Sequence, residues 1–370
     1  MSDGMPPPPG WQPPPEAAPG QQSPPPGWQQ APPPSPQPGL PPSGPGHPGP
    51  QYAAAHKPGA IALRPLRLGD IYDGSFRVIR YNPRATVGAA LVVASVAMLV
   101  PVLVTAVLTW TLGTSLEFET DARGNPTDLA GVAGALGAYG SLLLGAFLQQ
   151  IGLLLVSGMV AHVVAAAAIG RKLTLGEAWA ATHGRRWRLV GLTVLLTATL
   201  LALALYAATF FVLYFVGASV LVYVLYSLVT GPLLIVGLLV FWVRVYYLAV
   251  PCLVLEQLGV WASLRRSASL TKGHFWRTLG IGLLTVIIAG VAGQVLGVPV
   301  SLIGNVAAVL VDPAYSLLVL IVAQAIGSAL SGALVAPFST AVSACQYLDL
   351  RMRKEAYDVD LMTQAGLTGP

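Results

Sequence analysis

The residue of this sequence most able to do chemistry is an arginine inside an apolar run. Arg244 is the only ionised residue within residues 232–251. A charge at the centre of a membrane span costs about 2.5 to 3.5 kcal/mol on the insertion scale, so it normally has a partner or a task. Two interpretations are open. Either Arg244 pairs with Asp349, Glu256 or a backbone carbonyl and fixes helix packing, or it faces a vestibule and holds an anionic headgroup or substrate.

A basic segment, residues 255–277, follows this run and adds candidates for an anion site. Against one acid it carries four cations: Arg265, Arg266, Lys272 and Arg277. The candidate polar or lipid-headgroup site therefore comprises Arg244, Glu256, Asp349, Arg265 and Arg266. The sequence contains no nucleophile with a neighbouring base, no phosphate-binding loop and no metal-ligating cluster. We predict no catalytic residue, no cofactor and no metal, and hence no enzymatic activity.

The composition predicts the class of protein that must position these residues. Only 9% of the 370 residues are charged and 54% are hydrophobic, whereas a soluble domain carries about 25% charged residues. The sequence therefore predicts an all-α, polytopic helical membrane protein. Its net charge of +5 lies mainly in short segments that are predicted to be cytosolic. This pattern indicates contact with anionic lipid headgroups and excludes nucleic acid as a partner.

Residues 1–60 hold most of the 32 prolines and differ from the rest of the chain. A segment rich in Pro, Gly, Gln and Ser cannot bury enough apolar surface to offset chain entropy, so we predict a disordered tail. The pentapeptide Pro-Pro-Gly-Trp-Gln occurs twice, around Trp11 and Trp28. Either tryptophan could dock a protein partner of the tail. The alternative is a low-complexity tail that only keeps the terminus soluble.

Six apolar runs are long enough to cross a bilayer, which requires about 20 residues each. We predict spans at residues 85–112, 141–169, 189–216, 232–251, 279–298 and 315–347. Short interfacial pieces are predicted at 129–139, 219–228 and 301–311, with breaks at Gly231-Pro232 and Pro299. The predicted architecture is three hairpins in a membrane domain of residues 61–350, followed by a short charged tail of residues 351–370.

The distribution of Lys and Arg predicts the orientation. Eighteen of the 20 lie before the first span, between spans two and three or four and five, or after the sixth. Only Arg123 lies on the opposite side, and Arg244 is within a span. Because positive loops stay inside, both termini are predicted to be cytoplasmic in a bacterial inner membrane.

Each odd-numbered span is preceded by a predicted amphipathic helix. The first covers residues 68–84, with charges on one face and apolar residues on the other. The second begins with a capping box in which Thr174 is the N-cap and Glu177 reaches back. Leu-Gly opens all three, at Leu68, Leu175 and Leu258, which indicates a threefold internal repeat.

Short motifs in and around these segments resemble a known family. They are Arg64-Pro65-Leu66 with residues 68–73 (LGDIYD), residues 177–179 (EAW), residues 255–256 and 264–267 (LE and LRRS), residues 273–276 (GHFW) and residues 347–355 (YLDLRMRKE). Over about residues 61–362 the chain resembles the membrane domain found beside glycerophosphoryl diester phosphodiesterases in bacteria, which is often encoded alone in actinobacteria. The resemblance implies a membrane module.

The catalytic part of that family is missing from the resemblance. Its phosphodiesterase chemistry belongs to a separate barrel of roughly 250 residues, and no stretch of this sequence can form one. The family's barrel carries a His-Arg pair and a Glu-x-Asp metal motif. Glu119-Thr120-Asp121 matches the second in letters only, because no His-Arg pair lies near it.

Three hypotheses of function follow. The first is a non-enzymatic membrane module that organises lipids or recruits a partner through its Pro-rich tail. The second is a transporter or flippase-like protein for an anionic or amphipathic molecule, with Arg244 in the path. The third and most remote is a membrane-embedded enzyme of lipid metabolism, for which the sequence offers no constellation.

Overall fold

The computed structural model describes residues 59–112, 129–217 and 219–366, and within these ranges every regular element is a helix. Six of the described helices are long and apolar enough to cross a membrane. The predicted class, an all-α membrane protein with six spans, is therefore confirmed. Trp11, Trp28 and the Glu119-Thr120-Asp121 triplet lie outside the described residues.

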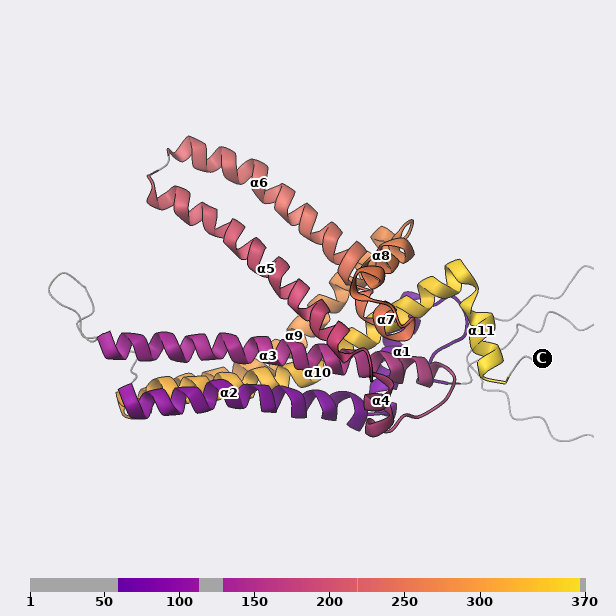
Figure 1. Cartoon of the computed structure of the whole chain (residues 1–370), viewed down its shortest axis with the longest axis horizontal. Helices are drawn as coiled ribbons and strands as arrows, with labels where there is room; N and C mark the ends of the chain where they lie inside the picture. The colour runs from indigo at the N-terminus through magenta and orange to yellow at the C-terminus, as the bar shows by residue number, and fades with distance from the viewer. Residues whose placement is uncertain (1–58, 113–128, 218, 367–370) are drawn as a thin grey trace, which may run out of the picture. The chain divides into compact units, whose positions relative to one another are not determined.

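Figure 1 labels most of the helices of the described ranges. In chain order they are α1 (Leu68–Tyr81), η1 (Arg84–Gly88), α2 (Ala89–Leu112), α3 (Leu129–Ala168), α4 (Leu175–Ala181), α5 (Arg186–Phe215), α6 (Val220–Phe241), η2 (Trp242–Tyr246), α7 (Ala249–Leu255), α8 (Val260–Thr271), α9 (Phe275–Leu310), α10 (Pro313–Glu355) and α11 (Tyr357–Gln364). The two η elements are π-helical turns that join a neighbouring α-helix without a loop.

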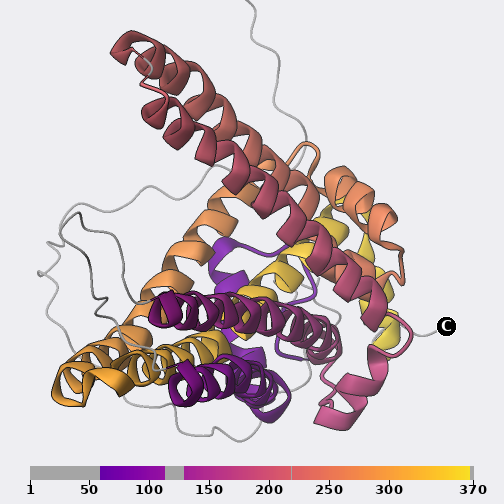
Figure 2. The ribbon, with the colours of Figure 1, turned by 60° about the vertical axis from the view of Figure 1, so that its left-hand side comes forward.

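Four long helices, α2, α3, α9 and α10, pack side by side (Figures 1 and 2). Small residues allow the close approach: a Cβ on Gly304 of α9 would lie only 2.2 Å from the Cβ of Ala323 on α10. The amide of Gln149 on α3 donates to the carbonyl of Ser328 on α10 at 3.0 Å. Such interhelical hydrogen bonds satisfy amides that lipid cannot.

Helices α5 and α6 form a second, separate pair that leaves the four-helix group at an angle (Figure 2). Their contact includes Phe210 against Tyr226, with ring centroids 4.9 Å apart, and a hydrogen bond of 2.6 Å between the hydroxyls of Thr209 and Tyr226. No residue of α6 is buried. This pair therefore presents most of its apolar surface outward, as a lipid-facing element does.

The main core lies at one end of the long helices, which we call the polar end. It is the end where residues 59–67, α1, α4, α8 and α11 lie (Figure 1). Residues 59–67 contribute four buried side chains to this core: Ile61, Ala62, Leu63 and Leu66. The N–H of Ala60 donates to the carbonyl of Ala167 at 2.8 Å. The chain is thus anchored in the core before its first helix begins.

Three predicted breaks are wrong, because the structure continues the helix through each. α3 runs through residues 129–168 without an interfacial piece, α6 passes through Gly231-Pro232, and α9 passes through Pro299. Proline removes one backbone donor, but in a membrane the neighbouring turns and helices satisfy the freed carbonyl, so the helix need not stop. Pro337 likewise lies inside α10.

The fourth span is interrupted further along than predicted. After α6, the π-helical turn η2 gives way to a short break near Leu248, and α7 continues to Leu255. The N–H of Tyr247 donates to the carbonyl of Trp242 at 2.8 Å, the i to i−5 bond of a π-turn. Arg244 lies within this π-helical turn.

Two predicted local signals are found in the structure. Thr174 accepts from the N–H of Glu177 at 3.3 Å, and the carboxylate of Glu177 accepts from the N–H of Thr174 at 2.7 Å, so the capping box is formed. Helix α1 begins at Leu68 as predicted. Leu-Gly opens α1 and α4, but at the third position Gly259 is the N-cap and α8 begins one residue later.

Candidate functional site

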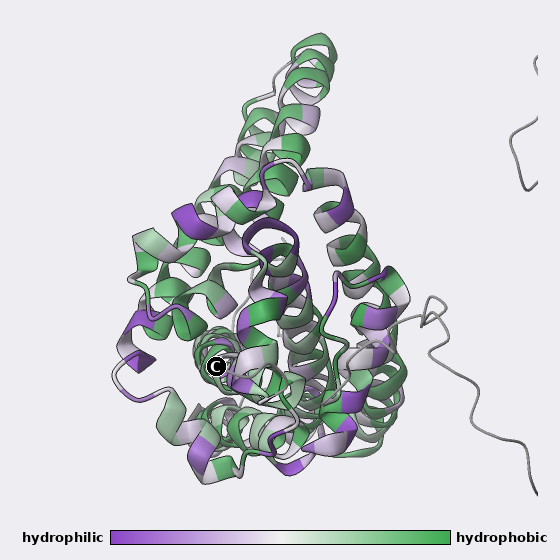
Figure 3. Cartoon of the chain, turned by 90° about the vertical axis from the view of Figure 1, so that its right-hand side faces the viewer, coloured by the Kyte–Doolittle hydropathy of each residue, from purple (hydrophilic) through white to green (hydrophobic). Residues whose placement is uncertain are grey.

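Hydrophilic residues, purple in the end-on ribbon of Figure 3, occur at the polar end. Here the last turns of α10 contact α8, the start of α9 and residues 59–67. The last ten residues of α10 alternate between two faces. Tyr347, Arg351 and Glu355 are spaced by four on one face, and Asp349 and Arg353 share the other. Each face holds a separate polar cluster.

The first cluster, which we call the Asp349 cluster, is built on a fully buried carboxylate. Asp349 is 0% exposed and accepts from the N–H of Leu66 at 2.7 Å and from Nε of Arg353 at 2.9 Å. It also pairs with Arg277 at the start of α9. Both arginines donate onward to the carbonyl of Leu66, Arg277 at 2.7 Å and Arg353 at 2.9 Å.

This arrangement gives the buried carboxylate both opposite charges and hydrogen-bond donors. An unpaired carboxylate would be costly in the interior, but Asp349 has two cations and a backbone donor. The peptide groups of Leu66 are held on both sides, N–H by the acid and C=O by the two bases. The cluster therefore joins the entry segment, α9 and α10.

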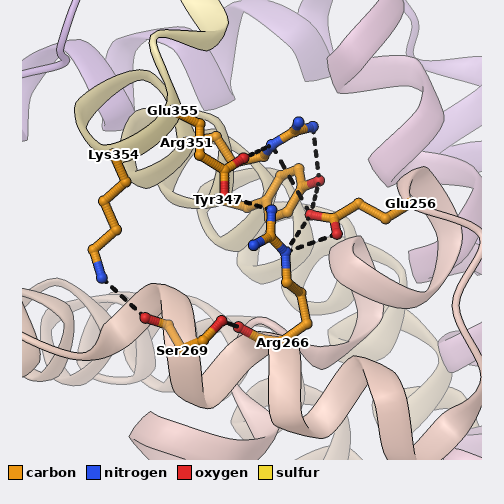
Figure 4. Close-up of polar contacts among 7 residues, drawn as sticks. All are labelled: Glu256, Arg266, Ser269, Tyr347, Arg351, Lys354 and Glu355. Atoms are coloured by element: carbon orange, nitrogen blue, oxygen red, sulfur yellow. Dashed lines mark hydrogen bonds and ion pairs between the residues drawn. The ribbon is translucent and has the colours of Figure 1, made fainter.

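The second cluster, which we call the Glu256 cluster, joins α7, α8 and α10 (Figure 4). The carboxylate of Glu256 accepts from Nε of Arg266 at 2.7 Å and from the hydroxyl of Tyr347 at 2.8 Å. Arg266 also donates to Glu355 at 2.6 Å, and Glu355 accepts from Arg351 at 2.8 Å. The guanidinium of Arg351 is 3.9 Å from Glu256, which closes the ring.

The balance of charge in the Glu256 cluster is two acids and two bases. Burial alone would lower the pKa of Arg266, but the hydrogen bonds and charges of Glu256 and Glu355 outweigh it and raise that pKa above its usual value. Lys354 extends the network by donating to the carbonyls of Ser269 and Lys272, at 2.9 and 2.6 Å. The C-terminal end of α8 is thereby fixed to α10 as well.

Arg244 lies apart from both clusters. It is exposed on the η2 turn, and its side chain makes no ion pair or hydrogen bond with any residue that the structure describes. Its carbonyl, freed by the irregular turn, accepts from Ser267 of α8 at 3.1 Å. The interpretation that Arg244 pairs with Asp349 or Glu256 is wrong, because nearer arginines occupy both acids.

The five predicted site residues are thus divided among three places. Glu256 and Arg266 belong to one cluster, Asp349 belongs to the other, and Arg244 and Arg265 are exposed. Sequence analysis missed further members: Arg277, Tyr347, Arg351, Arg353 and Glu355. The signal that could have found all of them except Arg277 is the pair of series spaced by four residues at the end of α10. Across the described ranges, His, Cys, Asp and Glu do not gather in groups of three or more suited to a metal.

Comparison with known proteins gives one finding. Residues 223–361 match the family model described as the membrane domain of glycerophosphoryl diester phosphodiesterase. The resemblance expected over residues 61–362 is therefore confirmed over that range, which includes both sides of the Glu256 cluster. No curated protein and no solved structure was found to match the chain.

Proposed function

We propose that this chain, in which residues 223–361 are similar to a phosphodiesterase membrane domain, is a non-enzymatic module that organises anionic lipid at the cytoplasmic face of a bacterial plasma membrane. The matched range corresponds to the membrane part of that family and not to its catalytic barrel. The described charged groups in the interior at the polar end serve to join helices. They leave an outer rim of cations for lipid.

The observation that carries this proposal is that exposed tryptophans and exposed cations occur together at the polar end. Trp187, Trp261 and Trp276 are 86%, 69% and 80% exposed, on α5, α8 and α9. Tryptophan with this exposure at a helix end is typical of the headgroup layer. The exposed cations of the same end include Arg84, Arg171, Lys172, Arg188 and Arg265. Each cation near an anionic surface contributes about 1 kcal/mol of attraction.

The orientation follows from the same residues. Positively charged segments remain on the cytoplasmic side, so the polar end and both termini belong there. The Pro-rich tail would then extend into the cytoplasm, where Trp11 and Trp28 are available to a protein partner. We propose this recruitment as the second part of the module's role. Deleting residues 1–60 should abolish capture of such a partner and leave membrane insertion unchanged.

Lipid selectivity around the reconstituted protein tests the proposal. Spin-labelled phosphatidylglycerol and phosphatidylcholine are compared in vesicles of mixed composition. We expect the motionally restricted fraction to be larger for phosphatidylglycerol, and the difference to shrink in 1 M salt because exposed charges are screened. Equal fractions for the two lipids at low salt would refute the proposal. Hydrolysis of a glycerophosphodiester by the same vesicles should equal that of protein-free vesicles.

A second candidate, a transporter for an anionic or amphipathic molecule, is favoured by Arg244. An exposed arginine on a π-helical turn within a span, without an acidic partner among the described residues, has the features of a substrate contact. Flux of a fluorescent anionic lipid in proteoliposomes should fall for Arg244→Ala and remain for Arg265→Ala, which removes the same charge elsewhere. An absence of flux in the wild-type protein would end this candidate.

A further inference from the structure

A hollow at the polar end, whose lining includes neither Arg244 nor a member of the two ion-pair clusters, is lined by groups that suit a phosphate. It has a volume of about 440 Å³ and is bounded by Gly59, Ala60, Arg77, Arg80, Tyr81 and Gly170. Its walls come from three parts of the chain: the entry segment, the last turn of α1 and the turn after α3. A hollow of this size is within the usual range for small-molecule sites.

The cations of this hollow exceed its acids. Arg77 is held by Asp73 through two contacts, Nε to Oδ1 at 3.0 Å and a second at 2.9 Å. Arg80 is exposed and pairs with no carboxylate among the described residues. Lys172, two residues after the lining residue Gly170, has its Nζ 4.1 Å from the ring centre of Tyr81, another lining residue, and it too has no described acidic partner. Two positive charges are therefore available to an anion.

The backbone of the hollow includes a close approach at Gly59, where only glycine fits. A Cβ on Gly59 would lie 2.0 Å from the carbonyl oxygen of Ala167 and 2.5 Å from the N of Gly170. Gly170 itself has φ of +79°, which ends α3 in the left-handed region. The entry segment is thus pressed against the end of α3, which places the hollow's walls without help from a ligand.

The depth of the hollow favours a lipid headgroup as the source of the anion. The neighbouring spans begin at Arg84 and end at Ala168, so Tyr81 and Gly170 are only three and two residues from the apolar layer. At 1.5 Å per helical residue this distance is about 3 to 5 Å, the level at which phosphates lie. Arg80 and Lys172 would meet the phosphate, and the ring of Tyr81 would contact the glycerol.

We propose that Arg80 and Lys172, with the free edge of Arg77, form a specific site for a phosphate ester, filled by the headgroup of one anionic phospholipid or by a free phosphate. The site would take one molecule with defined stoichiometry, unlike the general attraction of the cationic rim. This proposal is compatible with both a lipid-organising module and a transporter, because the site includes neither Arg244 nor any member of the two clusters.

Native mass spectrometry of the full chain in a neutral detergent tests this site. Phosphatidylglycerol is titrated against wild type, Arg80→Gln, Lys172→Gln and Lys272→Gln. Lys272 is the matched control, because it is an exposed lysine with no described acidic partner and lies on α8, away from the hollow. Arg80→Gln and Lys172→Gln should each weaken binding of the first lipid molecule about tenfold, the effect of one lost charged hydrogen bond. Lys272→Gln should leave it unchanged.

Two further arms identify the source of the anion. Phosphatidylcholine, with its own cation, should bind more weakly than phosphatidylglycerol if the site takes a lipid headgroup. Inorganic phosphate should protect the wild-type protein from thermal unfolding, and Arg80→Gln should lose that protection, if the site takes free phosphate. The proposal is overturned if Arg80→Gln and Lys172→Gln reduce neither the binding of phosphatidylglycerol nor the protection by phosphate more than Lys272→Gln does. Loss of lipid selectivity in vesicles with this response intact would refute the module but not the site.

Discussion

Single residues at the polar end act mainly as junctions between segments far apart in sequence. Asp349 shows this most clearly, because the one carboxylate contacts the entry segment, α9 and its own helix. Burial makes the junction demanding: a charge with 0% exposure must keep its partners, whereas a surface charge can do without them. The arginines that serve it remain partly hydrated, which reduces what the pairs contribute.

Replacing Asp349 by Asn should therefore destabilise the protein strongly. Asn still accepts from the N–H of Leu66, but it leaves Arg277 and Arg353 close together without the charge between them. We expect a loss of about 3 kcal/mol, the lower limit for a broken buried pair, because the two arginines are 29% and 31% exposed. Thermal unfolding in detergent, followed by tryptophan fluorescence, measures the effect.

The control is Asp360→Asn, which makes the same chemical change on α11, where Asp360 is exposed and pairs with no described residue. Its unfolding temperature should match that of the wild type. If Asp349→Asn unfolds at the same temperature as Asp360→Asn, then the Asp349 cluster is not what holds the entry segment.

The short helices show how an element can be fixed by its ends. Helix α8 is bound to α7 and α10 through Arg266 and to α10 again through the lysine at residue 354. Helix α4 has no such ion pairs with the described residues: its capping box holds the first turn, and Arg185 and Arg186 donate to carbonyls of its last turn. These two elements therefore respond to different changes, one to loss of a cation and the other to pH.

Adjacent arginines of α8 should behave very differently. Arg266→Gln removes the pairs with Glu256 and Glu355 and leaves Arg351 as the one described cation that contacts both acids. We therefore expect a loss of about 1 to 2 kcal/mol after allowing for the partial exposure of Arg266. Arg265→Gln, one residue earlier, removes an exposed charge with no described partner and should change stability by less than about 0.5 kcal/mol. Unfolding temperatures of the two variants decide the matter; equal losses would contradict the assignment.

The cap of α4 should weaken in acid. Hydrogen bonds from the backbone N–H and the hydroxyl of Thr174 lower the pKa of Glu177 below its usual value of 4.5. A carboxyl with a lowered folded pKa stabilises the fold above its unfolded pKa, and this contribution is lost as the pH falls through the folded value. A spin label at an Ala180→Cys substitution should therefore become more mobile below about pH 4.5.

The Glu177→Gln variant is the control for this titration. It cannot lose a charge, so its label should show the same mobility throughout that pH range. Labelling is selective, because Cys252 and Cys345 are both buried. An identical acid response in both proteins would place its origin outside the cap.

Sequence patterns predicted what depends on neighbours along the chain. The six spans, the start of α1 and the Thr174–Glu177 box have causes within a few residues, and the structure contains them. The continuous paths of α6 and α9 through Pro232 and Pro299 could not be foreseen, because they depend on packing that proline alone does not reveal. The ion-pair partner of Asp349 was missed for the same reason. Opposite charge alone suggested Arg244, but the residue that contacts Asp349 in the folded chain is Arg277.

At the scale of the whole membrane domain, polarity is segregated along the long helices. The ion-pair clusters and exposed tryptophans lie at the polar end, while the apolar flanks of the spans are open to lipid. A water-soluble protein with so much exposed leucine and valine would need a binding partner to cover them. In a membrane protein the lipid tails cover these side chains directly.

Labelling of introduced cysteines tests the orientation of this arrangement. With both native cysteines buried, a membrane-impermeant maleimide should react in intact cells with Cys placed at Val311, between α9 and α10. It should react with Cys placed at Arg265 or Asp360 only after the cells are opened. Reaction at position 265 in intact cells would reverse the proposed topology and move the cationic rim to the outside.

The contacts of Leu66 also affect how the protein can be made. Its amide waits for an acceptor 283 residues further along the chain. A ribosome adding roughly 5–20 residues per second needs about 14 to 57 seconds to cover that distance. During this interval four or five spans are already in the bilayer while the entry segment is undocked. The entry segment can dock only after α10 has been made, so a nascent chain that stops before α10 should be recognised and degraded as unfinished.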